Sequence, residues 1–141
     1  MKNKHRASVL IIMMVMLFSF INIEVRANEN NIDEVSVQPR GYYLAEGTSS
    51  ITKTGMYTIS ATGVTTAARK CNVSVMVTVQ QFRNDKWYNY TSWQASNENA
   101  YTATISNTIY VDLGYYYRVV SVHGAETDSS SSATNAIWMG L

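Results

Sequence analysis

Apolar and polar residues alternate with a period of two along most of the chain after residue 56. The clearest example is Val111 to His123, where Leu113-Gly114 turns the chain. Beyond this turn the alternate residues from Tyr115 to Ser121 form one set, and those between them, to Val122, form the other. A period of two with aromatic and β-branched residues predicts a strand. Because both sets are largely apolar, we expect this strand to lie at the centre of a sheet.

The same period predicts further strands along the chain. They are Met56 to Thr62, Cys71 to Phe82, Trp87 to Tyr90, Tyr101 to Ser106 and Ala136 to Met139, with short candidates at Gly41 to Leu44 and Ser50 to Lys53. We predict loops at Gly63 to Lys70, Trp93 to Asn99 and Gly124 to Ser131. Arg83 to Lys86 is predicted as a hairpin turn, because Asn and Asp tolerate unusual backbone angles. About seven strands at intervals of roughly 8–12 residues predict an all-β fold, an antiparallel sandwich of two sheets.

The first 27 residues have the layout of a secretory signal peptide. Basic residues begin the chain, an apolar run from Ala7 to Ile21 follows, and Val25-Arg26-Ala27 offers small or apolar residues where a signal peptidase reads. A membrane anchor is the alternative, but a spanning helix needs about 20 apolar residues and this run is shorter. We therefore predict cleavage near Ala27, a polar arm or linker over 28–46, and a β-sandwich domain over 47–141.

The charge of the chain argues against nucleic acid as a partner. The whole sequence has a formal net charge of +1, whereas residues 28–141 carry seven basic and nine acidic side chains. A weakly acidic domain lacks the basic patch that phosphate backbones require. Once the leader is removed, no cationic amphipathic segment remains that would engage a membrane.

Candidates for chemistry are few. Cys71 is the only cysteine and shares the face of its strand with four valines, which predicts a buried, unreactive thiol. His123 is the only histidine after residue 27, and at the end of a predicted strand we expect it at the surface or rim. No glycine-rich phosphate loop or Gly-x-Ser-x-Gly elbow is present. The sequence thus predicts no catalytic residues, no metal site and no cofactor.

Aromatic residues are the one feature that suggests a binding site. Trp87, Tyr88, Tyr90 and Trp93 fall within seven positions, and Tyr42, Tyr43 and Tyr116 add to them. Tryptophan and tyrosine offer a large apolar area with a polar tip, which suits sugar rings and protein partners. The alternative is that they stabilise the sheet as cross-strand pairs.

From Val75 to Trp138 the order of features resembles fibronectin type III and related immunoglobulin-like domains. A long strand leads through a polar turn to Trp87, and later Leu113-Gly114 precedes a Tyr-x-Tyr-Arg-Val strand. The resemblance implies that Tyr115 is a corner tyrosine whose hydroxyl bonds backbone upstream. The layout also resembles small uncharacterised secreted proteins of Gram-positive bacteria, which implies export and no particular activity.

These observations lead to an expected function. We expect a secreted or cell-surface binding module without catalytic activity, which takes a cell-wall glycan or a protein through the aromatic hairpin. A secreted antagonist resembling a bacteriocin is one alternative. A self-associating surface protein is another, since Val73 to Gln80 is uncharged and would favour aggregation on a sheet edge. The oligomeric state does not follow from the sequence.

Overall fold

The computed structural model describes residues 32–37 and 41–141, and every regular element in this part of the chain is a β-strand. The prediction of an all-β antiparallel fold is therefore confirmed. The predicted signal peptide and its cleavage near Ala27 lie outside the described residues. The seven strands are β1 (Ile32–Val37), β2 (Leu44–Lys53), β3 (Thr58–Arg83), β4 (Lys86–Tyr110), β5 (Tyr115–Ala125), β6 (Asp128–Ala133) and β7 (Ile137–Met139).

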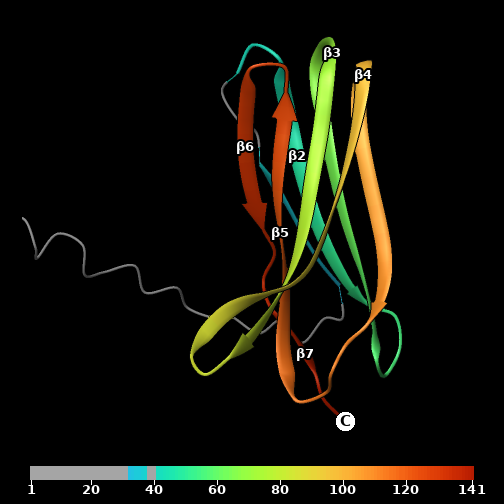
Figure 1. Cartoon of the computed structure of the whole chain (residues 1–141), viewed down its shortest axis with the longest axis vertical. Helices are drawn as coiled ribbons and strands as arrows, with labels where there is room; N and C mark the ends of the chain where they lie inside the picture. The colour runs from blue at the N-terminus through green and yellow to red at the C-terminus, as the bar shows by residue number, and fades with distance from the viewer. Residues whose placement is uncertain (1–31, 38–40) are drawn as a thin grey trace, which may run out of the picture.

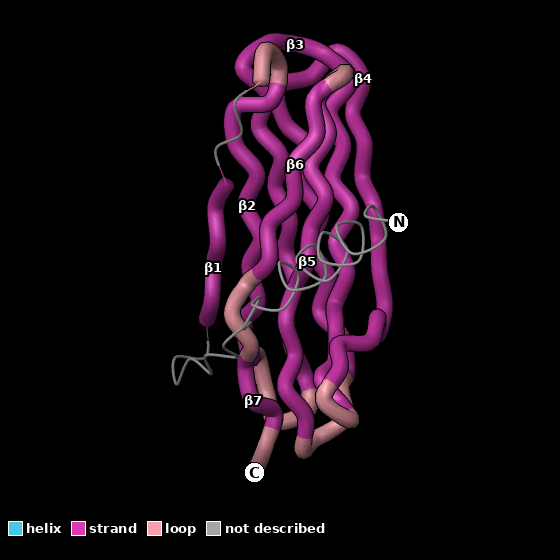
Figure 2. The backbone as a smooth tube through the Cα atoms, turned by 90° about the vertical axis from the view of Figure 1, so that its left-hand side faces the viewer, coloured by secondary structure: helices cyan, strands magenta, loops and turns pink. Residues whose placement is uncertain are grey.

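All seven strands are hydrogen-bonded into one sheet, in which every pair is antiparallel (Figure 1). The main order is β1-β2-β3-β5-β6, with β4 pairing β3 and β7 pairing β5. The first half of β3 pairs β2, its second half pairs β5, and β4 follows it along almost its whole length. The sheet thus has two walls, which are joined through β3 and β4 at one end of the elongated molecule (Figure 2).

The two longest strands run through stretches that we predicted as loops. Gly63 to Lys70 lies within β3, and Trp93 to Asn99 lies within β4, so both loop predictions are wrong. The register between the two strands shifts at Thr66/Cys71 and Cys71/Val73, where the sheet passes from one wall to the other. Ahead of these shifts a glycine is required at position 63, because a Cβ atom on Gly63 would lie 2.4 Å from the Cγ2 atom of Val77. The expected loop at Gly124 to Ser131 is shorter than predicted, since β5 ends at Ala125 and β6 begins at Asp128.

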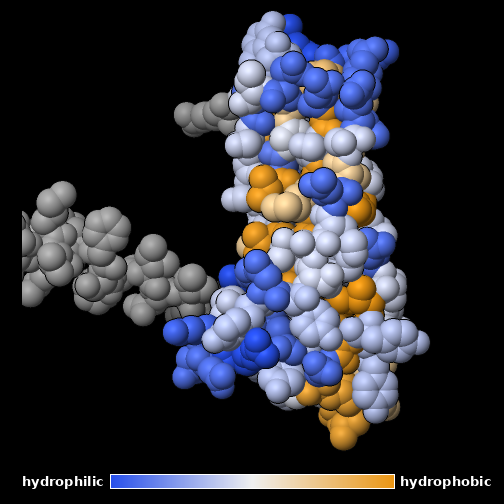
Figure 3. Space-filling view, in the orientation of Figure 1, coloured by the Kyte–Doolittle hydropathy of each residue, from blue (hydrophilic) through white to orange (hydrophobic). Residues whose placement is uncertain are grey.

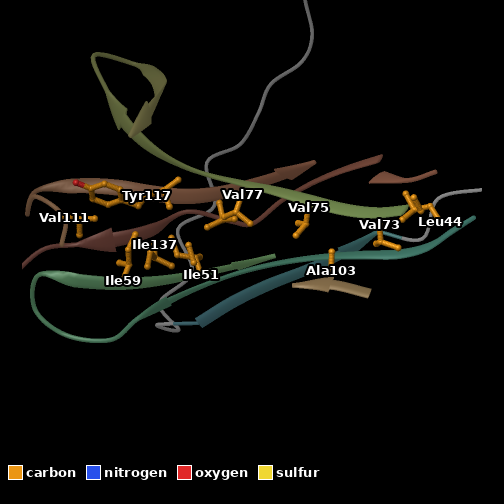
Figure 4. Packing of buried hydrophobic residues seen from close by; sticks show 14 of the residues in the cluster. Leu44, Ile51, Ile59, Val73, Val75, Val77, Ala103, Val111, Tyr117 and Ile137 are labelled. Carbon is orange, nitrogen blue, oxygen red and sulfur yellow. The ribbon is translucent and has the colours of Figure 1, made fainter. Parts of the chain in front are cut away.

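The core lies between the two walls, as the period of two requires (Figure 4). Val73, Val75, Val77 and Val79 point inward from β3 and are at most 1% exposed. Ile51 and Ile59 face them from the other wall. Cys71 is buried at the end of the valine row, which confirms its prediction, and its thiol is free. Burial, together with the negative charges of Glu126 and Asp128, raises the pKa of this thiol.

The sheet curls until its two edges nearly meet at β1 and β6. The carboxylate of Asp33 in β1 accepts hydrogen bonds from the backbone N–H and the side-chain amide of Asn135, just beyond β6. At the other end of the seam the carboxylate of Asp128 accepts N–H groups of Tyr43 and Leu44, which lowers its pKa. The strands β1 and the start of β2 lie in the segment 28–46 that we expected to be an arm.

The strand after Leu113-Gly114 has the two faces that its pattern predicts. Tyr117, Val119 and Ser121 are fully buried, whereas the residues between them are partly exposed. The corner hydrogen bond is made by Tyr117, whose hydroxyl donates to the Asp112 carbonyl over 3.0 Å. We had assigned that role to Tyr115, which lies at the surface. Its side chain is on the same side of β5 as that of Tyr117, but the buried part of this side begins only at Tyr117.

The segment Val73 to Gln80 is not a sheet edge. It is paired by β4 on one side and by β5 on the other, so its backbone groups are not free to recruit another chain. The premise from which we inferred self-association through this segment is therefore wrong. The described residues contain no helix that could span a membrane.

Candidate functional site

The β3–β4 hairpin ends in a two-residue turn whose geometry sets the register of the strands around it. Asn84 and Asp85 have φ angles of 50° and 59°. Two successive residues with positive φ form the turn whose twist matches that of antiparallel strands. The turn pairs Arg83 with Lys86 and therefore places Phe82 opposite Trp87. The predicted hairpin turn is thus confirmed.

On the outer face of the sheet, four aromatic side chains stand side by side across four adjacent strands. Phe82 in β3 is opposite Trp87 in β4 and also opposite Tyr116 in β5, and Tyr116 is opposite Trp138 in β7. The ring centroids of Phe82 and Trp87 are 5.1 Å apart, and those of Tyr116 and Trp138 are 4.8 Å apart. We call these four residues the aromatic row. Trp138 is 47% exposed, so it offers more of its surface than an ordinary packed tryptophan would.

A second line of side chains runs beside the aromatic row and is polar. The side-chain amide of Gln80 donates to the Asn89 Oδ1 atom over 2.9 Å, and the Arg118 Nε–H donates to the Gln80 Oε1 atom over 2.9 Å. We call Asn89, Gln80 and Arg118 the polar ladder. The Arg118 guanidinium also lies 4.2 Å above the centre of the Trp87 ring, a cation–π contact that fixes both groups. Burial lowers the pKa of Arg118, which nevertheless stays protonated at neutral pH.

The aromatic row borders a surface hollow of about 490 Å³ near the end of the molecule. Its walls are Phe82, Tyr116 and Trp138 together with the two turns, at Arg83 to Asp85 and at Gly114-Tyr115. Apolar ring faces, an amide and a carboxylate therefore converge on one concave surface. The lining of this hollow is more polar than apolar, so the hollow offers hydrogen-bonding groups beside the rings of Tyr116 and Trp138.

The structure divides the four predicted binding residues between the two faces of the hairpin. Trp87 belongs to the aromatic row. Tyr88, Tyr90 and Trp93 lie on the opposite face: the Tyr90 ring packs edge-on against Tyr117 at 5.6 Å, and Trp93 packs against the core. Tyr88 lies beneath the Arg83 guanidinium at 4.4 Å.

Sequence reasoning missed two members of the aromatic row, Phe82 and Trp138. Phe82 closes a strand pattern and Trp138 lies in a short last strand, so neither falls within the dense run after Trp87. The signal for Phe82 was present, because a two-residue turn at Asn84-Asp85 necessarily places Phe82 beside Trp87. The outer position of Trp138 depends on the pairing of β5 with β7, which no pattern within one strand reveals.

A second cluster of polar groups lies inside the molecule, around His123. The imidazole is fully buried, which overturns our expectation of a rim position. Its Nδ1 atom is 2.9 Å from the Thr65 hydroxyl and its Nε2 atom is 2.8 Å from the Ser132 hydroxyl. Ser49 hydrogen-bonds with Ser132 and donates to Ser121 over 2.6 Å. We call these five residues the interior cluster.

The interior cluster is complete and closed. Each buried side-chain nitrogen and oxygen of the described residues has a hydrogen-bond partner. Gly47 packs directly against the imidazole ring, since a Cβ atom at this position would lie 2.4 Å from two ring carbons of His123. Burial lowers the pKa of His123, so the imidazole is neutral at neutral pH. A histidine next to a serine is a familiar catalytic pair, but this pair is buried between the two walls.

Among the described residues no three His, Cys, Asp or Glu side chains gather as metal ligands would. Comparison with family models, characterised proteins and solved structures finds no match. The candidate binding site therefore rests on geometry alone. It consists of the aromatic row, the polar ladder and the hollow beside them.

Proposed function

We propose that this protein is an exported binding module without catalytic activity, and that it binds glycans at the aromatic row. The observation that carries the proposal is the row itself: four aromatic side chains in register across β4, β3, β5 and β7, beside a hollow lined by two turns.

A glycan suits this surface because a sugar ring has an apolar face of C–H groups and a rim of hydroxyls. The apolar face packs on an aromatic ring, and the hydroxyls need donors and acceptors beside it. Asn89 and Arg118 of the polar ladder supply such groups along one side of the aromatic row, and Asn84 and Asp85 supply them in the hollow. Figure 3 shows hydrophilic and hydrophobic residues mixed on the face of the molecule that this view presents.

Binding is favoured over catalysis by the position of the only histidine–serine pair in the described chain. His123 and Ser132 are enclosed by the two walls, whereas the aromatic row on the outer face brings together no histidine, cysteine or pair of carboxylates. A glycan bound at the row would therefore contact aromatic rings and hydrogen-bonding side chains.

Export and fold kinship belong to the same proposal. We take residues 1–27 as a signal peptide on the grounds given for the sequence, with the cell surface or medium as the destination. Kinship with fibronectin type III and immunoglobulin-like sandwiches is supported by the hydroxyl of Tyr117, which bonds the Asp112 carbonyl five residues upstream. The two walls of the sheet would correspond to the two layers of such a sandwich.

Sedimentation with insoluble glycans tests the proposal. Purified protein is mixed with peptidoglycan, chitin, cellulose, xylan and starch, and the bound fraction is measured. We expect selective binding, weakened about tenfold or more in Trp138→Ala, since this exposed indole borders the hollow and an exposed aromatic anchor carries much of the energy of a small site. Tyr110→Ala is the matched control, because Tyr110 is 80% exposed and lies opposite Thr58, away from the row. Equal loss in both variants, or no binding to any of the five, contradicts the proposal.

A further inference from the structure

The strand β4 forms an open margin of the sheet. It pairs β3 along one side, and among the described strands none pairs its other side (Figure 1). The margins β1 and β6 differ from it, because they nearly meet and the Asp33 carboxylate bonds across the gap to Asn135. A free strand edge presents a row of backbone N–H and C=O groups that can pair with another extended chain.

The outward-facing backbone groups of β4 can be identified from one hydrogen bond. The Val111 N–H donates to the Tyr57 carbonyl over 2.8 Å, so these two residues form a hydrogen-bonded pair. Such pairs alternate along antiparallel strands. The odd-numbered residues from 103 to 109 therefore bond to β3, and the even-numbered ones turn their backbone groups outward. The Thr62 and Ser106 hydroxyls, 2.7 Å apart, agree with this assignment, because side chains lie closest at pairs without hydrogen bonds.

The open part of this margin runs from Thr104 to Tyr110, and we call it the free edge. Before it, the side-chain amide of Asn97 already donates to the Thr102 carbonyl over 2.8 Å. Between Glu98 and Asp112 the chain has no charged residue and no proline. Proteins usually protect an edge with charges, proline or a very short strand, as in the six-residue β1 with its two carboxylates. The free edge has none of these protections.

The core is incompletely covered beneath the free edge. Ile105 and Ile109 pack against the core but stay partly exposed, whereas Ile51 and Ile59 in the same wall are fully buried. The difference arises because the described part of this wall ends at β4. A further strand beside β4 would cover the flank of both isoleucines and satisfy the outward backbone groups. Its occupant must therefore be extended, and apolar at alternate positions.

The free edge of a second copy meets both requirements. If two β4 strands pair antiparallel with Asn107 opposite Asn107 of the second copy, Ile105 lies opposite Ile109 of the second copy, and the reverse. Ser106 then lies opposite Thr108 of the second copy, and these outward-facing residues exchange backbone hydrogen bonds. Moving the axis to Ser106 would oppose Ile105 with Asn107 instead. The first register matches apolar with apolar and amide with amide, and no charges repel each other.

We propose that this protein forms a symmetric dimer in which the free edges of two copies pair antiparallel, with Asn107 on the twofold axis. The contact uses the same edge in both copies, so it closes with two. Specific interfaces usually bury about 1,200–2,000 Å², and one pair of strand edges lies at the small end of that range. The aromatic row belongs to the other wall, where β3 pairs β5, so dimer formation is independent of the proposed glycan site.

Sedimentation velocity tests the proposal on the purified protein over about 1–100 µM, the range in which so small an interface is expected to dissociate. We expect a monomer that converts to a dimer as the concentration rises. Thr108→Pro should weaken the dimer at least about tenfold, since it removes an outward N–H but no bond to β3. Thermal unfolding confirms that this variant is folded. A monomer at every concentration, or an unchanged dimer in Thr108→Pro, overturns the proposal.

Cysteine cross-linking tests the register without relying on affinity. Opposite residues of a pair without hydrogen bonds have Cα atoms about 4.5 Å apart, which suits a disulfide. Under mild oxidation we expect Asn107→Cys to form a covalent dimer. Ile105→Cys is the matched control and should remain monomeric in a denaturing gel, because position 105 lies opposite position 109. The reverse result overturns the register. Trp138→Ala should dimerise as the unsubstituted protein does, so failure of the dimer and failure of glycan binding are distinguishable.

Discussion

The aromatic row and the interior cluster both include residues of β3 and β5, but they face opposite sides of the sheet. Tyr116 and Tyr117 are neighbours in the sequence, yet the ring of Tyr116 joins the row and that of Tyr117 lies in the core. The interior cluster holds the more reactive groups, an imidazole between two hydroxyls. It is sealed, however, and every polar atom is satisfied. The aromatic row contains only packing groups, but Trp138 is exposed and the other three rings are partly exposed.

The difference teaches that access decides which cluster can act on a ligand. The interior cluster joins the walls, because Ser49 and Thr65 come from one and Ser121, His123 and Ser132 from the other. We therefore assign the interior cluster to stability and propose that the aromatic row serves recognition. Changes in the interior cluster should lower stability without altering the affinity of the folded protein, and changes in the aromatic row should do the reverse.

The largest effect on stability is expected for His123→Ala. The substitution leaves a cavity and removes the partner of the buried Thr65 hydroxyl, which together cost about 3 kcal/mol of unfolding free energy. Urea unfolding measures this loss. Glycan affinity measured well below the unfolding midpoint should be unchanged. A variant that lost affinity but kept its stability would place His123 in recognition and break the division between the clusters.

The next effect tests the other face of the aromatic hairpin. Trp93 packs partly buried against the core opposite Val77, so Trp93→Ala should lower the unfolding free energy by about 2 kcal/mol through lost packing. Its glycan affinity should match that of the unsubstituted protein. Urea unfolding and sedimentation are made on the same preparation. Loss of binding in this variant would return Trp93 to the site that the sequence predicted.

A smaller effect follows from the pKa of His123. Burial lowers this pKa in the folded state, so below the unfolded value of about 6.5 the unfolded chain binds a proton that the native protein does not. Stability should therefore fall as the pH drops below that value, by up to about 1.4 kcal/mol per unit, until the folded pKa is reached. Unfolding free energies between pH 7.5 and 5 measure the slope. In His123→Gln the slope should be reduced, and an unchanged slope would assign it to other groups.

The smallest effect on stability is expected for Trp138→Ala. Its indole is half exposed and lies over Gly140 at the end of the chain, so we expect a loss of less than about 1 kcal/mol. The same substitution should weaken glycan binding about tenfold or more. Tyr110→Ala should change neither quantity. If Trp138→Ala destabilised the protein as much as His123→Ala does, the aromatic row would serve to stabilise the fold. The division between a stabilising cluster and a binding surface would then be wrong.

Local patterns predicted the strand faces well. The alternation from Tyr115 to Ser121 indicated correctly which face of the strand is buried. It also contained the signal that His123 is buried. That residue has the same parity as Tyr117, Val119 and Ser121, so continuing the period by one step would have placed it in the core. We expected it at the rim because the strand was taken to end there, whereas β5 continues to Ala125.

Pairing between strands could not be predicted from any one of them. The aromatic row exists because β3 pairs both β4 and β5, and β5 pairs β7. Gly63 to Lys70 was expected to be a loop because glycine, alanine and charged residues interrupt the apolar pattern. The glycine is needed instead to let the valine side chains of the opposite wall come close. Only the three-dimensional contact explains why a small residue is required there.

The length of β3 has a consequence for how the protein unfolds. Its first half is bonded to β2 and its second half to β5, so one continuous strand belongs to both walls. Neither wall can separate from the other without breaking β3 in its middle and opening the core on both sides. Partial unfolding into two independent units is therefore disfavoured. The protein should melt as a single cooperative unit, with the hairpin of β3 and β4 as the element that couples its parts.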